Sequence, residues 1–381
     1  MGEHFEEIVG LVLYGLFMLA RRFLRKRQPE EQLPDPTRPA PPPRPAPATA
    51  SPSPRPSPPS ASPAVVVPRP WRDLDRRAAD LATLPGPWGI AQAFQQAGRL
   101  FFRATTGLEP ELRARMGLPR AAPLPASAET LVARQLALPM GPWMETLFAD
   151  AWATLALGPA YAVGLRRTLA TDDHEQAVTI LASDDGTHYG AIPPPHLRLL
   201  LSCDLLALLE HRAEASRQLT LWHGEVGSVE AFLLPTRAGD WAEVPDDLLR
   251  ELGARVQELI ASEPLASLGG ASLGALEGLR FTHADQNAAE QAAAALASGR
   301  IARVGPRVAL AAALLASDDA AGHEGAILAA LRRSLAPESP TARHAPERRP
   351  YDRPTASRGA FLDLSPAALR EAMVARAILW R

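Results

Sequence analysis

Cysteine is almost absent from this chain of 381 residues, because Cys203 is the only one. No disulfide can therefore form within the chain, and nothing in the cysteine content indicates an oxidising compartment. Cys203 lies in an apolar run, where we expect a buried thiol without a chemical role. The chain also lacks a strong net charge, which is −2 at pH 7. Bulk charge therefore predicts no nucleic-acid partner.

Several motifs of enzyme sites are missing as well. The sequence has no C-x-x-C pair, no Gly-x-x-x-x-Gly-Lys phosphate loop and no H-E-x-x-H helix. One match does occur, because Gly270-Ala-Ser272-Leu-Gly274 fits the Gly-x-Ser-x-Gly nucleophile turn. That motif presents its serine only between a strand and a helix. The residues before it do not have a strand pattern, so we interpret the match as a loop of small residues.

An uncharged apolar run, residues 8–20, lies near the N-terminus, with acidic residues before it and basic residues after it. A helix over residues 5–24 would be about 30 Å long, enough to span a bilayer if the flanking arginines snorkel. The charge order is the reverse of a secretory signal, and the positive-inside rule leaves the C-terminal side in the cytoplasm. We predict that residues 1–28 anchor a cytoplasmic globular part to the plasma (inner) membrane by a single pass. An interfacial helix, or one packed on the protein's own core, is the alternative.

The rest of the chain divides by composition. Residues 29–70 contain little but proline, alanine, serine and arginine, so they cannot bury enough apolar surface to fold. We expect a disordered, proline-rich linker there. Residues 71–336 predict a mainly α-helical globular domain with at most a minor β element. Residues 337–381 predict a loose connector followed by a C-terminal amphipathic helix.

Apolar periodicity predicts most of the elements of the globular domain. Residues 177–182 resemble a strand, residues 184–186 a turn, and residues 228–234 either a helix or a strand. Asp285 and the pair Asp318-Asp319 resemble helix starts. Helices are expected over residues 72–84, 88–105, 130–138, 196–211, 246–260, 284–298, 307–316 and 324–336.

The segment 141–164 contains the most apolar helix of the domain. Pro142 suits the first turn of a helix, and Gly158-Pro159 should end or kink it. A helix that is apolar nearly all round is buried, and its polar residues favour a protein core over lipid.

Asp150 lies within this helix. A carboxylate in such surroundings must be paired or hydrogen-bonded. We interpret it as structural and expect Arg198 or Arg166 to pair with it.

Two short segments of the domain resemble M48-type membrane-associated zinc metallopeptidases. Residues 146–153, Thr-Leu-Phe-Ala-Asp-Ala-Trp-Ala, are similar to the E-x-x-A-D-x-x-A helix of that family. Residues 192–198, Ile-Pro-Pro-Pro-His-Leu-Arg, are similar to its H-P-P-x-x-x-R segment. The resemblance covers about residues 140–205. The positions that the resemblance marks as structural are Asp150, Ala153, Gly158, Pro159, Pro193, Pro194 and Arg198.

The zinc ligands that the resemblance implies are missing from these segments. In that family, two histidines of an H-E-x-x-H helix and the glutamate opening E-x-x-A-D hold zinc. No histidine occurs between His4 and His174, and the glutamate falls on Thr146. Glu145 is turned by about 100° around the helix from that position, and the histidine before the prolines falls on Ile192. We therefore predict no catalytic residue, no metal ligand and no cofactor.

Other polar clusters offer weaker alternatives. Residues 172–175 and 184–188 contain aspartate, glutamate and histidine, which a surface metal site or a solvated loop would explain, and we favour the loop. His196, His211 and His223 contain no pair four residues apart, so the spacing of a helical zinc site is absent.

The sequence thus predicts a membrane-tethered, non-catalytic metallopeptidase-like protein that acts as a binding or scaffolding module. A protein partner is possible, and no small-molecule substrate is identifiable. The alternatives are an active zinc-dependent hydrolase with unrecognised ligands and a helical interaction module unrelated to peptidases.

Overall fold

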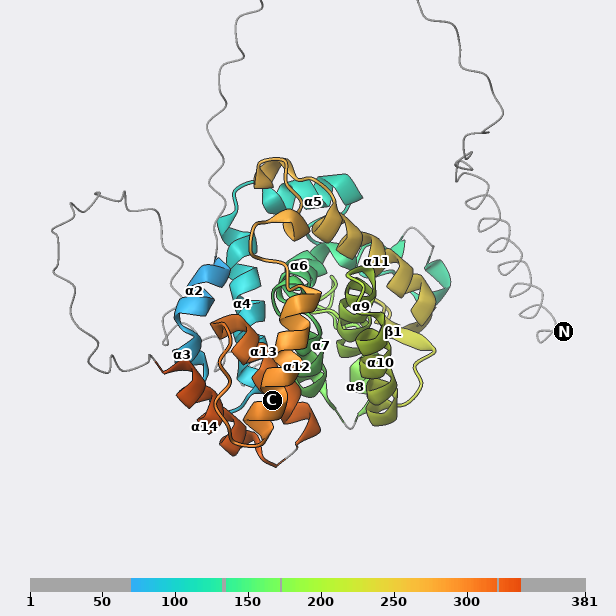
Figure 1. Cartoon of the computed structure of the whole chain (residues 1–381). Helices are drawn as coiled ribbons and strands as arrows, with labels where there is room; N and C mark the ends of the chain where they lie inside the picture. Colours follow the sequence, from blue (N-terminus) through green and yellow to red (C-terminus); the bar gives the residue numbers. More distant parts are fainter. Residues whose placement is uncertain (1–69, 132–134, 172, 321, 337–381) are drawn as a thin grey trace, which may run out of the picture. The chain divides into compact units, whose positions relative to one another are not determined.

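Helix α6 (Met140–Leu157) is the central element of the domain, and every residue in it except Pro142 and Glu145 is buried. Pro142 lies in the first turn, where its missing N–H costs no helical hydrogen bond. Because α6 is apolar nearly all round, it needs cover on all sides. That cover comes from α4 (Trp88–Ala104), α7 (Pro159–Leu169), α9 (Pro195–Leu208) and α11 (Asp246–Ser262), as Figure 1 shows.

The computed structural model describes residues 70–131, 135–171, 173–320 and 322–336. They form a mainly helical domain with one two-stranded antiparallel sheet, which confirms the prediction for the globular domain. The predicted membrane anchor, the proline-rich linker up to residue 69 and the C-terminal segment 337–381 lie outside the described residues. Within these residues, no helix is both long and apolar enough to cross a membrane.

The step Gly158-Pro159 separates α6 from α7, as the sequence predicts. Gly158 has φ +57°, a left-handed conformation that glycine adopts without strain. A Cβ atom at this position would lie 2.6 Å from the ring of Phe281. The backbone N–H of Phe281 in turn donates to the carbonyl of Leu155, at 2.7 Å. The chain therefore turns here and admits an aromatic side chain at the same point.

Helices α4 and α6 approach each other closely at Gly98. A Cβ atom there would lie 3.0 Å from both the Cα and the carbonyl oxygen of Ala149. Aromatic rings pack on both sides of this contact: Phe102 and Phe148 have centroids 5.1 Å apart, and Phe94 and Trp152 have centroids 6.2 Å apart. The close approach thus brings aromatic side chains of the two helices into contact on either side of the crossing.

A second group of helices covers the other side of α4 and α7. Helix α13 packs against α4, α7, α12 and α14. The bounds of the remaining helices are α2 (Pro70–Arg76), α3 (Ala78–Leu81), α5 (Leu108–Met116), α8 (His174–Val178), α10 (Arg212–Val226), α12 (His283–Ala297), α13 (Pro306–Asp319) and α14 (Glu324–Leu335).

The sheet is a hairpin of β1 (Ala231–Pro235) and β2 (Trp241–Pro245), with Phe232 opposite Val244. The sequence predicts either a helix or a strand over residues 228–234, and β1 shows that residues 231–234 form a strand. Three short 3-10 turns, at Ala128–Thr130, Ala266–Leu268 and Leu273–Ala275, complete the regular structure of the described residues.

The predicted strand over residues 177–182 is wrong. Residues 177 and 178 end α8, because the Asp173 side chain caps that helix by accepting from the N–H groups of Glu175 and Gln176. Thr179 and Ala182 make only isolated bridges, with Leu233 and Tyr189 respectively. The turn predicted at residues 184–186 is confirmed, since the Gly186 N–H donates to the Ser183 carbonyl at 2.8 Å.

Three other local predictions need correction. The helix expected over residues 72–84 divides at Arg77 into α2 and α3. Residues 130–138 form no α-helix in the part that is described. Asp318-Asp319 end α13 rather than begin a helix, whereas Asp285 does lie in the first turn of α12, in a capping box with Thr282. Helices α5 and α10 and strand β2 were not among the expected elements.

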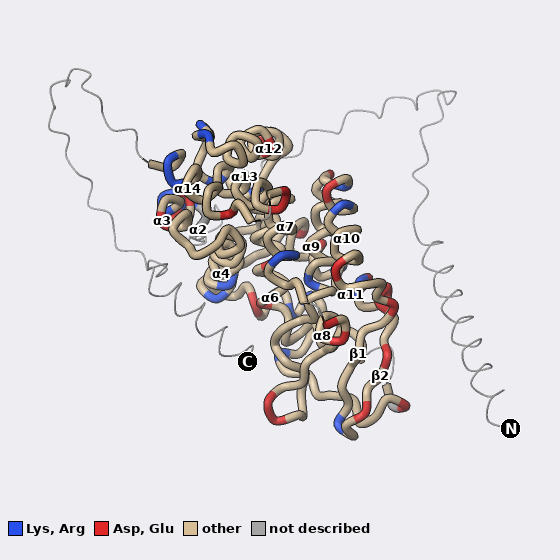
Figure 2. Tube along the Cα trace, turned by 90° about the horizontal axis from the view of Figure 1, so that it is seen from below, with Lys and Arg blue, Asp and Glu red and all other residues tan. Residues whose placement is uncertain are grey.

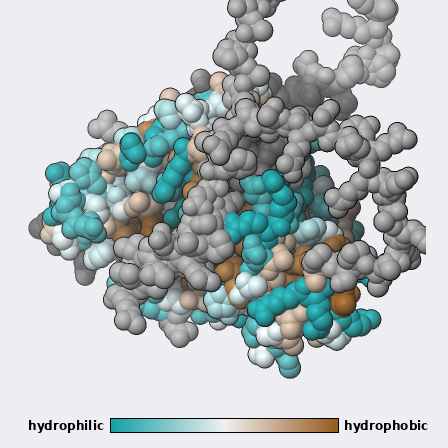
Figure 3. Space-filling model, turned by 90° about the vertical axis from the view of Figure 1, so that its left-hand side faces the viewer, coloured by the Kyte–Doolittle hydropathy of each residue, from teal (hydrophilic) through white to brown (hydrophobic). Residues whose placement is uncertain are grey.

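Acidic and basic residues both occur throughout the part of the chain that the structure describes. Basic and acidic segments are interspersed along the helices and loops in Figure 2. On the face shown in Figure 3, hydrophobic residues reach the surface in small areas between hydrophilic ones.

Candidate functional site

Asp150 of α6 and Arg198 of α9 form a buried, bidentate ion pair. The Arg198 Nε donates to Asp150 Oδ2 at 2.8 Å, and a terminal guanidinium nitrogen donates to Oδ1 at 2.8 Å. Asp150 is 1% exposed and Arg198 is 5% exposed. Burial is the largest single effect and lowers the pKa of Arg198, but the charge and hydrogen bonds of Asp150, together with Tyr161, raise it, so the net shift is upward. Of the two arginines that the sequence offers, Arg198 is thus the partner.

Two further donors complete the hydrogen bonding of the Asp150 carboxylate. The Tyr161 hydroxyl donates to Oδ1 at 2.6 Å, and the Gln95 amide donates to the same oxygen at 2.7 Å. Burial raises the pKa of Tyr161 well above its usual value, and the Asp150 charge raises it further. A carboxylate with four donors is held in one orientation, so Asp150 ties α4, α7 and α9 to the centre of the domain.

A second polar contact lies one helical turn away on the same two helices. Arg99 follows Gln95 by four residues on α4, and Thr146 precedes Asp150 by four on α6, so each pair shares a helix face. The Arg99 guanidinium donates to the Thr146 hydroxyl at 3.3 Å. The Nε of Arg99 is buried without a hydrogen-bond partner. Burial, followed by the charge of Arg198, lowers the pKa of Arg99.

Two cavities flank this polar crossing and meet at Ile192, which lines both. One, of about 400 Å³, lies against Arg99 and Thr146 and is lined mainly by the C-terminal half of α4, by α5 and by the first turns of α6. The other, of about 460 Å³, lies against Arg198. It is lined by residues of α8 and by the three prolines 193–195.

The sequence-predicted residues take distinct places around this site. Ala153 is fully buried in α6, and Gly158-Pro159 form its end. Pro193 and Pro194 are buried and precede α9, and the backbone N–H of Arg198 donates to the Pro194 carbonyl at 3.1 Å. The proline segment therefore fixes where α9 begins, and with it the place of Arg198.

Gln95, Arg99 and Tyr161 belong to the site but were not predicted from the sequence. A signal for two of them exists, because Gln95 and Arg99 are polar residues four apart in a helix with an otherwise apolar face. Tyr161 lies in the segment after Gly158-Pro159, where its apolar neighbours favour a core ring over a hydrogen-bond donor.

The histidines do not gather as one group. The rings of His196 and His223 have centroids 6.0 Å apart, whereas His211 lies against His283, at 4.5 Å. His196 is fully buried, and its Nδ1 accepts from Trp222 Nε1 at 2.7 Å. Burial, then the neighbouring His223, lowers the pKa of His196 to about 3. His196 is therefore neutral at physiological pH, with its proton on Nε2.

The remaining polar motifs have local structural roles. Asp173 caps α8, Asp185 accepts from Ser183 within a turn, and Ser272 lies between two 3-10 turns. Burial raises the pKa of the Cys203 thiol to about 12. In the part of the chain that the structure describes, no three histidine, cysteine, aspartate or glutamate side chains lie together as a metal site would require.

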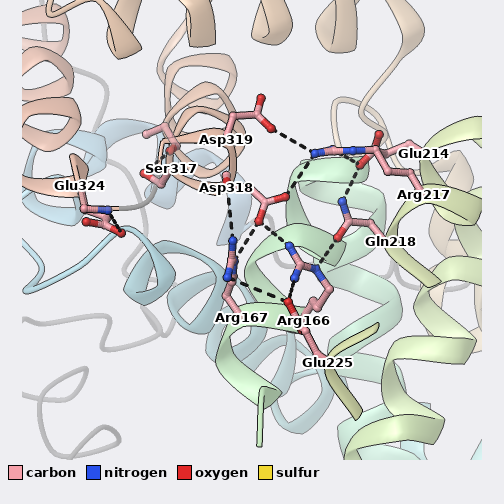
Figure 4. Close-up of polar contacts among 12 residues, drawn as sticks. Arg166, Arg167, Glu214, Arg217, Gln218, Glu225, Ser317, Asp318, Asp319 and Glu324 are labelled. Carbon is pink, nitrogen blue, oxygen red and sulfur yellow. Dashed lines mark hydrogen bonds and ion pairs between the residues drawn. The ribbon is translucent and has the colours of Figure 1, made fainter. Parts of the chain in front are cut away.

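A second buried charge network joins α7, α10 and α13 (Figure 4). The fully buried Arg166 donates to Gln218 at 2.8 Å and also contacts Glu225 and Asp318. Asp318 further accepts from Arg167 at 2.9 Å. These arginines offset the unfavourable position of a carboxylate at a helix C-terminus. The network connects the three helices.

Comparisons with protein-family models, with curated proteins and with solved structures find no match to this chain.

Proposed function

We propose that this protein is a non-catalytic relative of the zinc metallopeptidases that its sequence resembles, and that it acts as a binding module. The observation that carries the proposal is the polar crossing of α4 and α6. In the resembled family, two histidines four apart on one helix face a glutamate on a second helix. Here Gln95 and Arg99, four apart on α4, face Asp150 and Thr146 on α6.

The chemistry of these residues favours a role without a metal. Arginine is protonated at all physiological pH values and has no acceptor atom, so it cannot bind a metal ion. A guanidinium beside Thr146 also repels any cation placed between the two helices. Gln95 donates its amide hydrogen to Asp150 and thereby holds the place that a neutral ligand would need. Hydrogen bonds between protein side chains connect α4 and α6 at this crossing.

The close packing at Gly98 supports descent from such a scaffold. A glycine directly before Arg99 lets the two helix backbones approach, as a shared site between helices requires. The proline segment and Arg198 support the same reading, because they fix α9 against Asp150.

Restoring the family's ligands tests the proposal. In a triple variant, Gln95→His, Arg99→His and Thr146→Glu, we expect about one zinc ion per chain by elemental analysis, because the helix geometry would again present three ligands. The matched control carries Gln95→Asn, Arg99→Lys and Thr146→Ser and should bind none. If the folded triple variant binds no zinc, the chain is better explained as a helical module unrelated to peptidases.

The binding role would be exercised at a membrane if residues 5–24 span it. The apolar run with its basic C-terminal flank supports an anchor, and the proline-rich linker would hold the domain at a distance from the surface. Fractionation of cells tests this proposal. The full chain should remain with membranes after alkaline washing, and a chain lacking residues 1–28 should not; recovery of the full chain in the soluble fraction would reject the anchor.

A further inference from the structure

The cavity beside Arg99 has an excess of positive charge. Its charged lining side chains are Arg99, Arg103, Arg113, Arg120, Glu109 and Glu145. Four guanidinium groups face two carboxylates, so the lining carries a formal excess of two positive charges. A concave site with one dominant charge sign concentrates ions of the opposite sign.

Three of these arginines already have partners. Arg103 makes two hydrogen bonds to the Glu145 carboxylate, at 2.7 and 3.1 Å. Arg113 donates to Glu109 at 3.1 Å and to the carbonyl of Pro119 at 3.0 Å. Arg120, which is largely exposed, lies 3.4 Å from the same Glu109. The two carboxylates of the cavity are thus committed to these three side chains.

Arg99 is the arginine whose charge is left without a carboxylate partner. Among the described residues, its hydrogen bond is to the neutral Thr146 hydroxyl, and its Nε has no acceptor. The nearest carboxylates raise its pKa through space, but Asp150 is held by Arg198, and Glu145 by Arg103. Arg99 is partly buried, and a charge that is partly removed from water without a hydrogen-bonded counter-ion is unfavourable. An anion in the cavity would supply both the missing acceptor and the missing charge.

We infer that this cavity binds a small oxyanion, the phosphate or carboxylate group of a small molecule, with the Arg99 guanidinium as its direct contact. Arginine suits this role because its planar fork matches both groups. A volume of about 400 Å³ admits a small molecule rather than a folded partner. The inference names a ligand class for the binding role proposed above and rests on that role.

Calorimetric titration of the full chain in a non-ionic detergent tests the inference. Inorganic phosphate and succinate are the two probes, at constant ionic strength set with sodium chloride. We expect one binding site per chain for phosphate, for succinate or for both. Comparison of the two affinities shows whether the cavity prefers a phosphate or a carboxylate group. Arg99→Met should weaken binding at least about 10-fold, because a charge-assisted hydrogen bond is lost. The control Arg255→Met, at an exposed position on α11, should leave binding unchanged.

A second variant keeps the test decisive if Arg99→Met fails to fold. Ala191 lines the same cavity and is exposed, so Ala191→Asp adds a carboxylate at the rim without disturbing the core. We expect it to weaken anion binding several-fold. Absence of binding to both probes, or binding that neither variant alters, would overturn the inference. The proposed function has a separate test, which is the metal content of the unaltered chain. Stoichiometric zinc in that chain would reject the proposed function, whatever the anion titration shows.

Discussion

Asp150 and Arg198 lie 48 residues apart in the sequence and form an ion pair with two hydrogen bonds of 2.8 Å inside the domain. Both are almost completely buried, so neither charge has water as an alternative partner. The folded domain therefore requires both partners, because removing one charge leaves the other buried and unpaired.

Substitution of Asp150 by asparagine should destabilise the domain by about 3–5 kcal/mol, the cost of leaving a buried charge unpaired. Denaturant unfolding measures this change. Asp184→Asn, at an exposed turn position, is the control and should change stability by less than about 0.5 kcal/mol. The double variant Asp150→Asn, Arg198→Met should be less destabilised than the sum of its single variants. Additive losses would show that the pair is not coupled.

Gly98→Ala should destabilise the domain by about 1–3 kcal/mol through overpacking, since its Cβ atom would lie 3.0 Å from the backbone of Ala149. Gly224→Ala is a matched control on α10, where a Cβ atom meets nothing within 4 Å. That control should stabilise the domain by up to about 1 kcal/mol, because alanine favours the helix. Thermal unfolding of both variants compares the two signs. A stabilising Gly98→Ala would contradict the close crossing of α4 and α6.

The buried His196 should make the domain less stable in acid. Its pKa is lowered to about 3 in the folded chain and returns to its ordinary value of about 6.5 on unfolding. Between these pH values the unfolded chain binds one proton more, so stability falls by about 1.4 kcal/mol per unit as pH drops. Above pH ~6.5 the contribution is constant.

Urea unfolding at several pH values between about 3.5 and about 7.5 measures how the free energy of unfolding changes with pH. This range covers most of the interval between the two pKa values. His196→Gln should have a shallower slope than the natural chain over this window. Equal slopes in the natural chain and in His196→Gln would show that His196 does not titrate as described.

The network around Arg166 should matter for stability and not for ligand binding. Arg166→Met leaves the nearly buried Asp318 short of one partner and should cost about 3 kcal/mol. Arg167→Met, whose side chain is 32% exposed, should cost less than half as much. Denaturant unfolding compares the two variants. Similar losses would mean that the network is solvent-screened throughout.

The parts of the fold set by local pattern could be predicted from the sequence. Periodic apolar residues identify α4, α9, α11 and α12, and the all-round apolar pattern of α6 identifies the central helix. The strand expected at residues 177–182 failed because Asp173 caps a short helix there, and a side-chain cap outweighs β-propensity over so few residues. Strand β2 was missed because its alternation is supported by only two buried positions, Ala242 and Val244.

The candidate site was predictable only in part, for a physical reason. The need for an arginine opposite Asp150 follows from the cost of a buried charge, which holds in any fold. The approach of Arg99 to Thr146 depends on how α4 crosses α6, and no local pattern determines a crossing between helices more than forty residues apart. The charge balance of the cavity depends on the same crossing.

Zinc binding to the unaltered full-length chain tests the central claim most directly. The chain should be purified from cells grown with added zinc and measured by elemental analysis, then titrated with zinc against a chelating indicator. We predict well below about 0.1 zinc per chain and no saturable site, because Arg99 and Gln95 lie where ligands would be needed. One zinc per chain, retained against the indicator and lost in Asp150→Asn, would contradict the account.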